Sequence, residues 1–153
     1  MNIDMELLNI LRFFGLCVFA YLLGSVPWGL ILTRKFSSLD IREKGSGNIG
    51  AANVQRIAGS RLGVATLAGD MLKGVFPVWL AGVMTNSNDF RSEIFISLVA
   101  LCALSGHLYP VYLRFKNGGK GVATAAGCFL VMSPPACFIA IIIFGIVICL
   151  SNH

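Results

Sequence analysis

Two short segments of the chain combine glycine, small polar side chains and fixed positive charge. The first, residues 44–56, reads KGSGNIGAANVQR, with three glycines within six residues, and we call it the first loop. Glycine lets a backbone approach a ligand closely, and the N–H groups at the start of a following helix favour an anion. The segment predicts a phosphate site, although a turn between two membrane helices would use similar residues.

The second segment, residues 116–124, reads KNGGKGVAT and also precedes an apolar stretch; we call it the second loop. It lacks the G-x-x-x-x-G-K-[ST] spacing of a Walker A nucleotide site, and no acidic partner for Mg²⁺ is evident. Two basic glycine loops without a nucleotide fingerprint indicate two small phosphorylated ligands, or one ligand held from both sides.

The composition limits what kind of protein can carry these loops. The 153 residues are 56% hydrophobic and 12% charged, which predicts several membrane spans rather than a soluble domain. The formal net charge of +5 suits anionic lipid head groups and phosphorylated substrates, and we expect no nucleic acid partner. The five cysteines lie in apolar stretches without a C-x-x-C pair, so we interpret them as buried hydrophobic residues. We expect no metal and no cofactor.

Four apolar stretches predict the elements that position the loops. They cover residues 10–32, 62–84, 94–115 and 122–150, and ~20 apolar residues suffice to cross the hydrocarbon core. We therefore predict an all-α membrane bundle of about four to five membrane segments that forms a single domain, residues 1–153.

Prolines interrupt the first and the last of these stretches. Pro27 predicts a kink in the first helix, and the small residues beside it allow another helix to come close. We interpret Ser25 there as a packing residue, with contact to a ligand as the alternative. Pro134 and Pro135 divide the last stretch, either as a kink in one span or as the turn of a hairpin between two short segments. We favour the hairpin.

Lysine and arginine are distributed unevenly among the polar segments. Residues 33–61 carry six of them against Asp40 and Glu43, whereas residues 85–93 carry only Arg91. The positive-inside rule places residues 33–61 in the cytoplasm and the N-terminus outside. The basic second loop follows the third span, so both loops are predicted to share the cytoplasmic face.

Asp70, Lys73 and His107 lie well inside the predicted spans, away from their ends. Asp70 and Lys73 are three residues apart and share one helix face. His107 lies in the half of the third span that precedes the second loop. Because charges inside a membrane are costly, they usually face a partner or a functional site. A self-satisfied structural pair and a buried core histidine are the alternatives.

Together these segments resemble the bacterial membrane family of acyl-phosphate:glycerol-3-phosphate acyltransferases, commonly called PlsY. The resemblance covers the chain from the first span to about Thr124, and the rest more loosely. The matching motifs, in the family's order and close to its spacing, are GSVP at 24–27, GSGNIGAANVQR at 45–56, DMLKG at 70–74, GHLYP at 106–110 and GGKGVAT at 118–124.

The resemblance implies a small helical bundle in the bacterial inner membrane with its active site at the cytoplasmic face. It implies transfer of a fatty acyl group from acyl phosphate to the 1-hydroxyl of glycerol 3-phosphate, which yields lysophosphatidic acid and phosphate in phospholipid synthesis. Acyl phosphate is an activated donor, so the protein has to hold two phosphates side by side, orient the hydroxyl and stabilise the developing charge. A lipid tail would lie between helices, opening to the inner leaflet.

The loops then supply the expected site residues. Binding of the substrate phosphates is assigned to Gly45, Ser46, Gly47, Asn48, Asn53, Arg56, Gly118, Gly119 and Lys120. Catalytic roles are assigned to His107, Lys120 and Ser46, and supporting roles to Ser25, Asp70 and Lys73. Which loop holds which substrate is open. His107 either orients a phosphate or accepts the hydroxyl proton, and the departing phosphate is an alternative acceptor.

Three departures from the family pattern bear on activity. Ala52 stands where threonine is usual, and Asn117 is an apparent insertion that could displace the second loop. The family's C-terminal stretch, with a His…Asn-Ile-x-Arg pattern and a glutamate, has no counterpart here. We expect binding to survive and turnover to be weak. The alternative function is a non-catalytic truncated paralogue that binds lipid phosphate or a membrane partner. A small anion transporter is less favoured, since no inverted repeat is evident.

Overall fold

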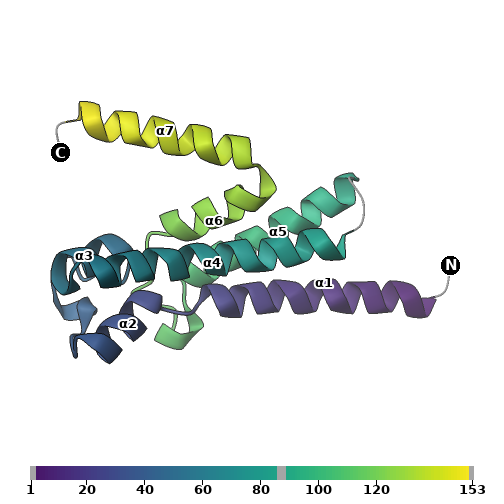
Figure 1. Ribbon diagram of the computed structural model, residues 1–153. Coiled ribbons are helices and arrows are strands. Elements are labelled where there is room, and N and C mark those ends of the chain that lie inside the picture. Colours follow the sequence, from purple (N-terminus) through teal and green to yellow (C-terminus); the bar gives the residue numbers. More distant parts are fainter. Residues whose placement is uncertain (1–2, 86–88, 152–153) are drawn as a thin grey trace.

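A computed structural model describes residues 3–85 and 89–151, and all the secondary structure in these residues is helical (Figure 1). The elements follow in the order α1 (Ile3–Gly24), α2 (Trp28–Phe36), η1 (Ile41–Glu43), α3 (Ala51–Ala58), α4 (Ser60–Met84), α5 (Phe90–Leu108), η2 (Val111–Leu113), α6 (Val122–Met132) and α7 (Pro134–Leu150), where η marks a 3-10 helix.

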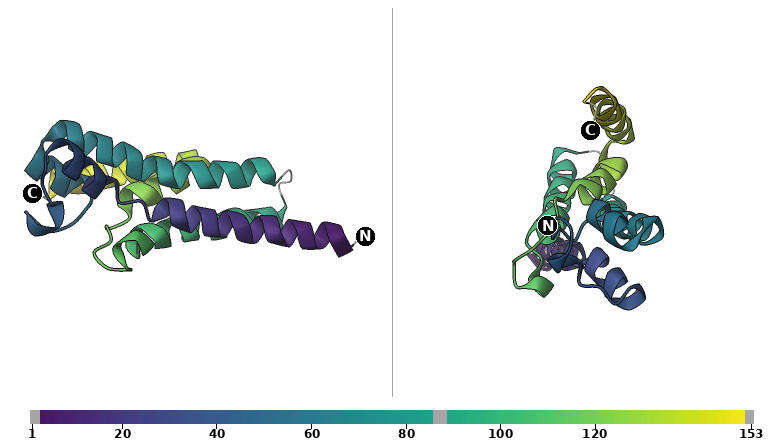
Figure 2. Two further views of the ribbon diagram at one scale, coloured as in Figure 1. Left: turned by 90° about the horizontal axis from the view of Figure 1, so that it is seen from below. Right: turned by 90° about the vertical axis from the view of Figure 1, so that its left-hand side faces the viewer.

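Three helical segments are long and apolar enough to cross a membrane. They are Leu7–Gly24 in α1, Ser60–Met84 as α4, and Phe90–Leu113, which joins α5 to η2. The predicted all-helical membrane fold is confirmed, and the second span agrees with the predicted residues 62–84. Both glycine loops lie at the end of the bundle away from the N-terminus (Figures 1 and 2).

The first apolar stretch is broken rather than kinked, so the predicted continuous helix over residues 10–32 is wrong. α1 ends at Gly24, and α2 begins at Trp28 in a different direction (Figure 1). Two local causes act together: Pro27 has no N–H to donate, and a residue before proline avoids helical geometry. The same rule applies at Tyr109, which precedes Pro110 and ends α5 at Leu108, before the predicted limit of residue 115.

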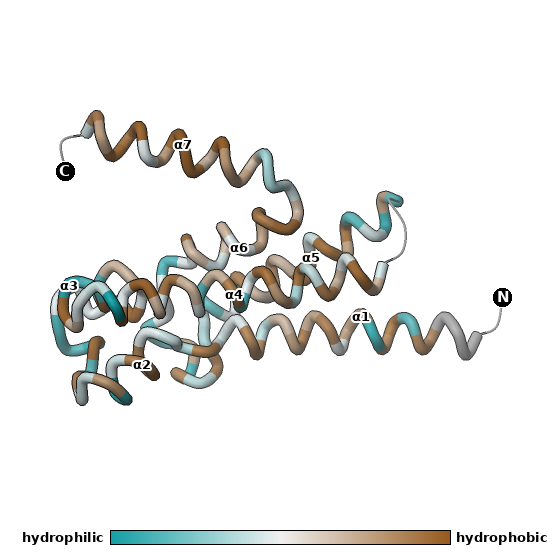
Figure 3. The backbone as a smooth tube through the Cα atoms, viewed as in Figure 1, coloured by the Kyte–Doolittle hydropathy of each residue, from teal (hydrophilic) through white to brown (hydrophobic). Residues whose placement is uncertain are grey.

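The last apolar stretch forms the favoured hairpin. α6 ends at Met132, and α7 folds back from Ser133 with two prolines in its first turn, where a missing N–H costs no hydrogen bond (Figure 1). α7 packs on α6, and its residues 138–150 are all exposed. The helix is apolar along nearly its whole length (Figure 3).

The long helices approach one another through glycines. α1 packs along α5, and α4 packs along α6. A Cβ atom built at Gly24 of α1 would overlap the carbonyl oxygen of Ala103 in α5, and one built at Gly106 would overlap the carbonyl oxygen of Tyr21. Since lipid tails are as apolar as side chains, helices associate in membranes largely through such close packing.

We expect Gly24→Ala to destabilise the bundle, because the added methyl group has to displace the backbone of α5. Overpacking of this kind costs about 1–3 kcal/mol, and a lower thermal unfolding midpoint in detergent would measure it. Gly15→Ala is the matched control in the same helix, since a Cβ at Gly15 meets nothing within 4 Å. Equal midpoints for the two variants would contradict the packing role of Gly24.

Candidate active site

Four polar side chains from three helices meet inside the bundle. Asp70 and Lys73 come from α4, His107 from α5 and Thr124 from α6, and each is at most 4% exposed. Lys73 Nζ lies 3.0 Å from Asp70 Oδ1. His107 Nδ1 lies 3.2 Å from Thr124 Oγ1 and 3.7 Å from Asp70 Oδ1. Both contacts of the imidazole are made through Nδ1. We call these four residues the buried polar cluster.

The buried polar cluster is tied to the break between α1 and α2. Lys73 Nζ donates a hydrogen bond of 2.9 Å to the carbonyl oxygen of Val26, the residue that leaves the helix before Pro27. Sequence analysis predicted both charges and the irregularity but not their contact, because 47 residues separate the two partners. Thr124 was also missed as a partner of His107, although it ends the motif of the second loop.

Ser25 positions the connection to the second loop. Its hydroxyl donates to the carbonyl oxygen of Tyr21 at 2.8 Å and accepts from the N–H of Val111 at 3.3 Å. Ser25 is 1% exposed. These contacts hold η2 against the end of α1.

The second loop lies directly on the last turn of α5. The N–H of Gly119 donates to the carbonyl oxygen of His107 at 3.2 Å. A Cβ atom at Gly119 would overlap His107 Nε2, and one at Gly118 would overlap the carbonyl oxygen of Leu108. Only glycine fits between the loop and the histidine. Asn117 is exposed with φ 55°, and the glycines after it stay seated on α5. Lys120 is exposed at the same place.

The first loop is organised by the side chain of Asn53. Its Oδ1 accepts from the N–H of Ser46 at 3.0 Å, and its Nδ2 donates to the carbonyl oxygens of Lys44 at 3.0 Å and Asn48 at 2.9 Å. Asn53 is 4% exposed, so its amide serves the loop backbone. Sequence analysis had grouped Asn53 with the phosphate ligands and missed this positioning role.

The remaining predicted ligands of the first loop are more accessible. Ser46 and Arg56 are exposed, and Asn48 is half-buried with its Oδ1 accepting from the N–H of Gly50 at 2.8 Å. Gly45 and Gly47 have φ of 61° and 69°, a left-handed geometry that glycine adopts without strain. The loop therefore presents a hydroxyl, a guanidinium and tightly turned backbone on its outer side.

An apolar base connects the two loops. Leu30, Ile41, Ile49 and Val54 form a buried cluster beneath the first loop, and Leu113 of η2, which precedes the second loop, packs against it. The first loop and the turn that leads into the second loop therefore rest on one apolar cluster.

An apolar groove opens beside the second loop. Its volume is about 550 Å³, and among the described residues that line it Lys120 is the charged one. The apolar walls come from α5, α6 and α7, and they include Leu104, Leu108, Phe129, Ala140 and Phe144. The groove thus places a positive charge next to a space that suits a hydrocarbon chain.

Comparison with known proteins agrees with this geometry. The sequence profile of a family described as glycerol-3-phosphate acyltransferase matches residues 14–153. Glycerol-3-phosphate acyltransferases of Syntrophotalea carbinolica and of an Anaeromyxobacter species are 51% and 48% identical, over 89% and 82% of this chain. The crystal structure of PlsY (YgiH), an integral membrane glycerol 3-phosphate acyltransferase in its glycerol 3-phosphate form, matches 89% of the chain with a TM-score of 0.79 and 37% identity.

The fold and the site define an integral membrane protein with two basic, glycine-rich loops and a buried histidine beneath the second of them. More narrowly, the chain belongs to the glycerol-3-phosphate acyltransferase family. The matched parts cover 67% of the Syntrophotalea protein, 61% of the Anaeromyxobacter protein and 66% of the PlsY structure, so the chain spans about two thirds of the length of these relatives.

We expect Asn53→Ala to loosen the first loop, because it removes the partners of one backbone N–H and of three backbone carbonyls, those of Ile41, Lys44 and Asn48. Leaving buried polar groups unsatisfied costs about 1–3 kcal/mol each. Faster hydrogen exchange at the Ser46 amide would report the loss directly. Gln55→Ala changes an exposed residue of the same helix and serves as the control. Unchanged exchange in the Asn53 variant would rule out the positioning role.

Proposed function

We propose that this chain transfers a fatty acyl group from acyl phosphate to the 1-hydroxyl of glycerol 3-phosphate. The observation that carries the proposal is His107, buried beneath Gly119 of a basic glycine loop and held through Nδ1 by Thr124 and Asp70. Membership of the glycerol-3-phosphate acyltransferase family supports the acceptor substrate.

The reaction needs no covalent intermediate on the protein. The hydroxyl oxygen of glycerol 3-phosphate attacks the acyl carbonyl carbon, and the bond between that carbon and the phosphate oxygen breaks. The products are lysophosphatidic acid and inorganic phosphate, and the hydroxyl proton goes to a base or to the departing phosphate. Holding the two substrates together and stabilising the developing charge supply most of the rate enhancement.

Each loop residue then has a role in this reaction. Lys120 and Gly118 hold one substrate phosphate, and Ser46, Arg56 and the glycine-rich backbone of the first loop hold the other. The N–H of Gly119 already donates to the backbone carbonyl of His107. Gly119 therefore acts by lacking a side chain, which lets the second loop lie directly against the imidazole.

His107 is the proton acceptor in this proposal. Its Nδ1 is turned toward Asp70 and Thr124, and its Nε2 is the ring atom next to Gly119. Nε2 is therefore the atom that faces the loop where the hydroxyl would lie. Asp70 and Lys73 keep the ring and the helix break in place without contacting the substrates.

The groove beside Lys120 is proposed to hold the acyl tail. Its walls are apolar helices, and a volume of about 550 Å³ is large enough for a long hydrocarbon chain. The uneven distribution of lysine and arginine supports placing both loops at the cytoplasmic face of the inner membrane, with the N-terminus outside.

A second candidate is a membrane protein that binds these ligands without turning them over. The test is acylation of glycerol 3-phosphate by the purified chain in detergent, alone and co-expressed with the C-terminal third of a relative. Binding of both substrates with turnover in neither preparation would support the second candidate. Binding of neither substrate would overturn the active-site assignment.

We expect Lys120→Ala to reduce acyl transfer by ~10²-fold or more, because it removes the charge that stabilises a phosphate next to the acyl groove. Lys116→Ala removes the same charge from an exposed position in the same loop and should stay close to the wild-type rate. Both variants are measured by initial rates of acyl transfer at saturating substrates, in whichever of the two preparations, the chain alone or the co-expressed chain, shows activity. If both variants lost the same fraction of the acyl-transfer rate, Lys120 would only attract anions in general and would not hold a specific phosphate.

His107→Gln should lower kcat by roughly 10²–10⁴-fold with little change in KM for glycerol 3-phosphate, as expected for loss of a general base. Thr124→Val keeps the shape of the side chain and leaves the contact between His107 and Asp70 in place. The decrease in kcat should therefore be smaller than for His107→Gln. A His107 variant that keeps kcat and raises KM would instead assign the imidazole to phosphate binding.

A further inference from the structure

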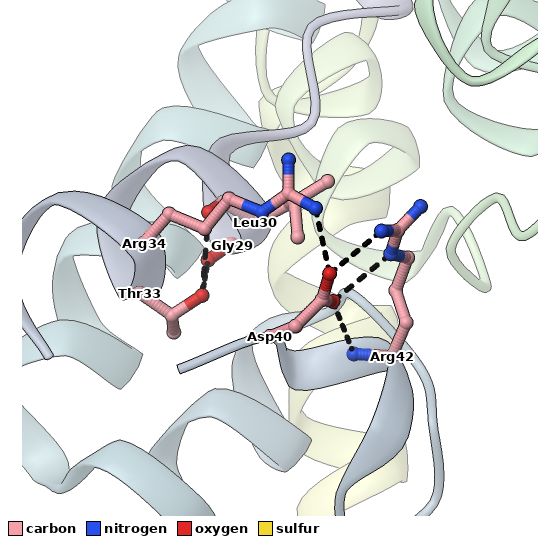
Figure 4. A network of polar contacts seen from close by, with 6 residues as sticks. All are labelled: Gly29, Leu30, Thr33, Arg34, Asp40 and Arg42. Atoms are coloured by element: carbon pink, nitrogen blue, oxygen red, sulfur yellow. Dashed lines mark hydrogen bonds and ion pairs between the residues drawn. The ribbon is translucent and has the colours of Figure 1, made fainter. Parts of the chain in front are cut away.

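A surface network that the proposed reaction does not use joins α2 to η1 (Figure 4). Arg34 Nη2 donates to Asp40 Oδ2 at 2.6 Å. Arg42 donates to the same carboxylate through Nε at 2.9 Å, Nη2 at 2.6 Å and its backbone N–H at 3.1 Å. The two guanidiniums converge on one carboxylate, and we call the three residues the arginine clamp.

The arginine clamp keeps a net positive charge. The hydrogen bonds from Arg42 and Arg34 hold the pKa of the Asp40 carboxyl well below its usual range, so Asp40 is ionised at neutral pH. The arginine clamp itself carries a charge of about +1. Glu43 also acts electrostatically on Arg42, but the adjacent Lys35 and Lys44 leave four positive against two negative side chains in residues 34–44. A guanidinium has five N–H donors, and Arg34 places only one of them on Asp40. The Arg34 side chain is 54% exposed, so its other donors face outward.

An apolar groove of about 410 Å³ begins beside Arg34. One wall is a single face of α2 and its preceding residue, since Pro27, Leu30, Ile31 and Arg34 follow the i, i+3, i+4, i+7 spacing. The other wall is formed by Val26, Tyr112 and Leu113. The groove is therefore apolar along its length and cationic at one end.

The groove lies beside the ends of two helical segments that are long and apolar enough to cross a membrane, Leu7–Gly24 and Phe90–Leu113. Tyr112, which lines the groove, is 57% exposed, and Phe36 and Tyr109, which are close in sequence to lining residues, are 64% and 62% exposed. Exposed aromatic residues near the end of a membrane helix are typical of the boundary between hydrocarbon and head groups.

We propose that this groove binds an anionic phospholipid from the leaflet on the side of the glycine loops. The lipid phosphate lies on Arg34 and Arg42, and one acyl chain lies against Ile31 and Tyr112. A free phosphate gains nothing from the apolar wall, and a lipid without net negative charge gains little from the arginine clamp. The inference does not depend on the proposed acyl transfer, because none of the described residues that line this groove also lines the groove beside Lys120.

Native mass spectrometry of the full chain in neutral detergent tests the proposal. Phosphatidylglycerol should bind about fivefold more tightly than phosphatidylcholine with the same acyl chains, the contribution of about one positive charge near an anionic lipid. Arg34→Gln should remove that preference, and Arg34→Lys, which keeps the charge, should retain most of it. Ile31→Ser should weaken binding of both lipids, because it removes apolar surface that the acyl chain contacts in the groove.

Arg61→Gln is the matched control, because it removes one exposed positive charge from α4 and leaves the groove unchanged. Equal loss of preference in the Arg61 and Arg34 variants would overturn the proposal in favour of diffuse attraction. Equal affinity of the wild-type chain for the two lipids would overturn it outright. Displacement of phosphatidylglycerol by excess inorganic phosphate would mean that the arginine clamp is a phosphate site and not a lipid site.

Discussion

The ion pair between Asp70 and Lys73 is the constraint on which the rest of the bundle depends. A charge inside a membrane is costly unless it has partners, and here each charge has more than one. Lys73 bonds to Asp70 and to the Val26 carbonyl, and Asp70 also lies beside His107. These contacts fix α4 against the end of α1 and against α5. The position of the histidine beneath the second loop follows from them.

Close backbone contacts make this arrangement possible. Gly24, Gly106 and Gly119 each lie where a methyl group would overlap a neighbouring segment. Two of them bring α1 and α5 together, and the third brings the second loop to His107. The same property of glycine therefore acts in packing and in forming the site, and a sequence alone does not separate the two uses.

Much of the architecture follows from local patterns. Apolar length predicted helices in all four apolar stretches, although prolines end the first and third helices before the predicted limits, and paired prolines predicted the hairpin of α6 and α7. Long-range partners were not predictable in this way. The bond from Lys73 to Val26 spans 47 residues, and Thr124 reaches His107 across 17. Asn53 was taken for a ligand because an asparagine beside glycines suits a phosphate equally well. Its role becomes visible only when the loop closes around its side chain.

The spacing of Asp70 and Lys73 also bears on how the chain is assembled. Because the two residues are one turn apart on α4, the helix can neutralise its own charges before any other helix is present. It can then leave the insertion machinery as a nearly neutral unit. Docking of Lys73 onto the Val26 carbonyl then fixes the register of α4 against the end of α1. The same lysine therefore lowers the cost of placing α4 in the membrane and selects where α4 rests against an earlier helix.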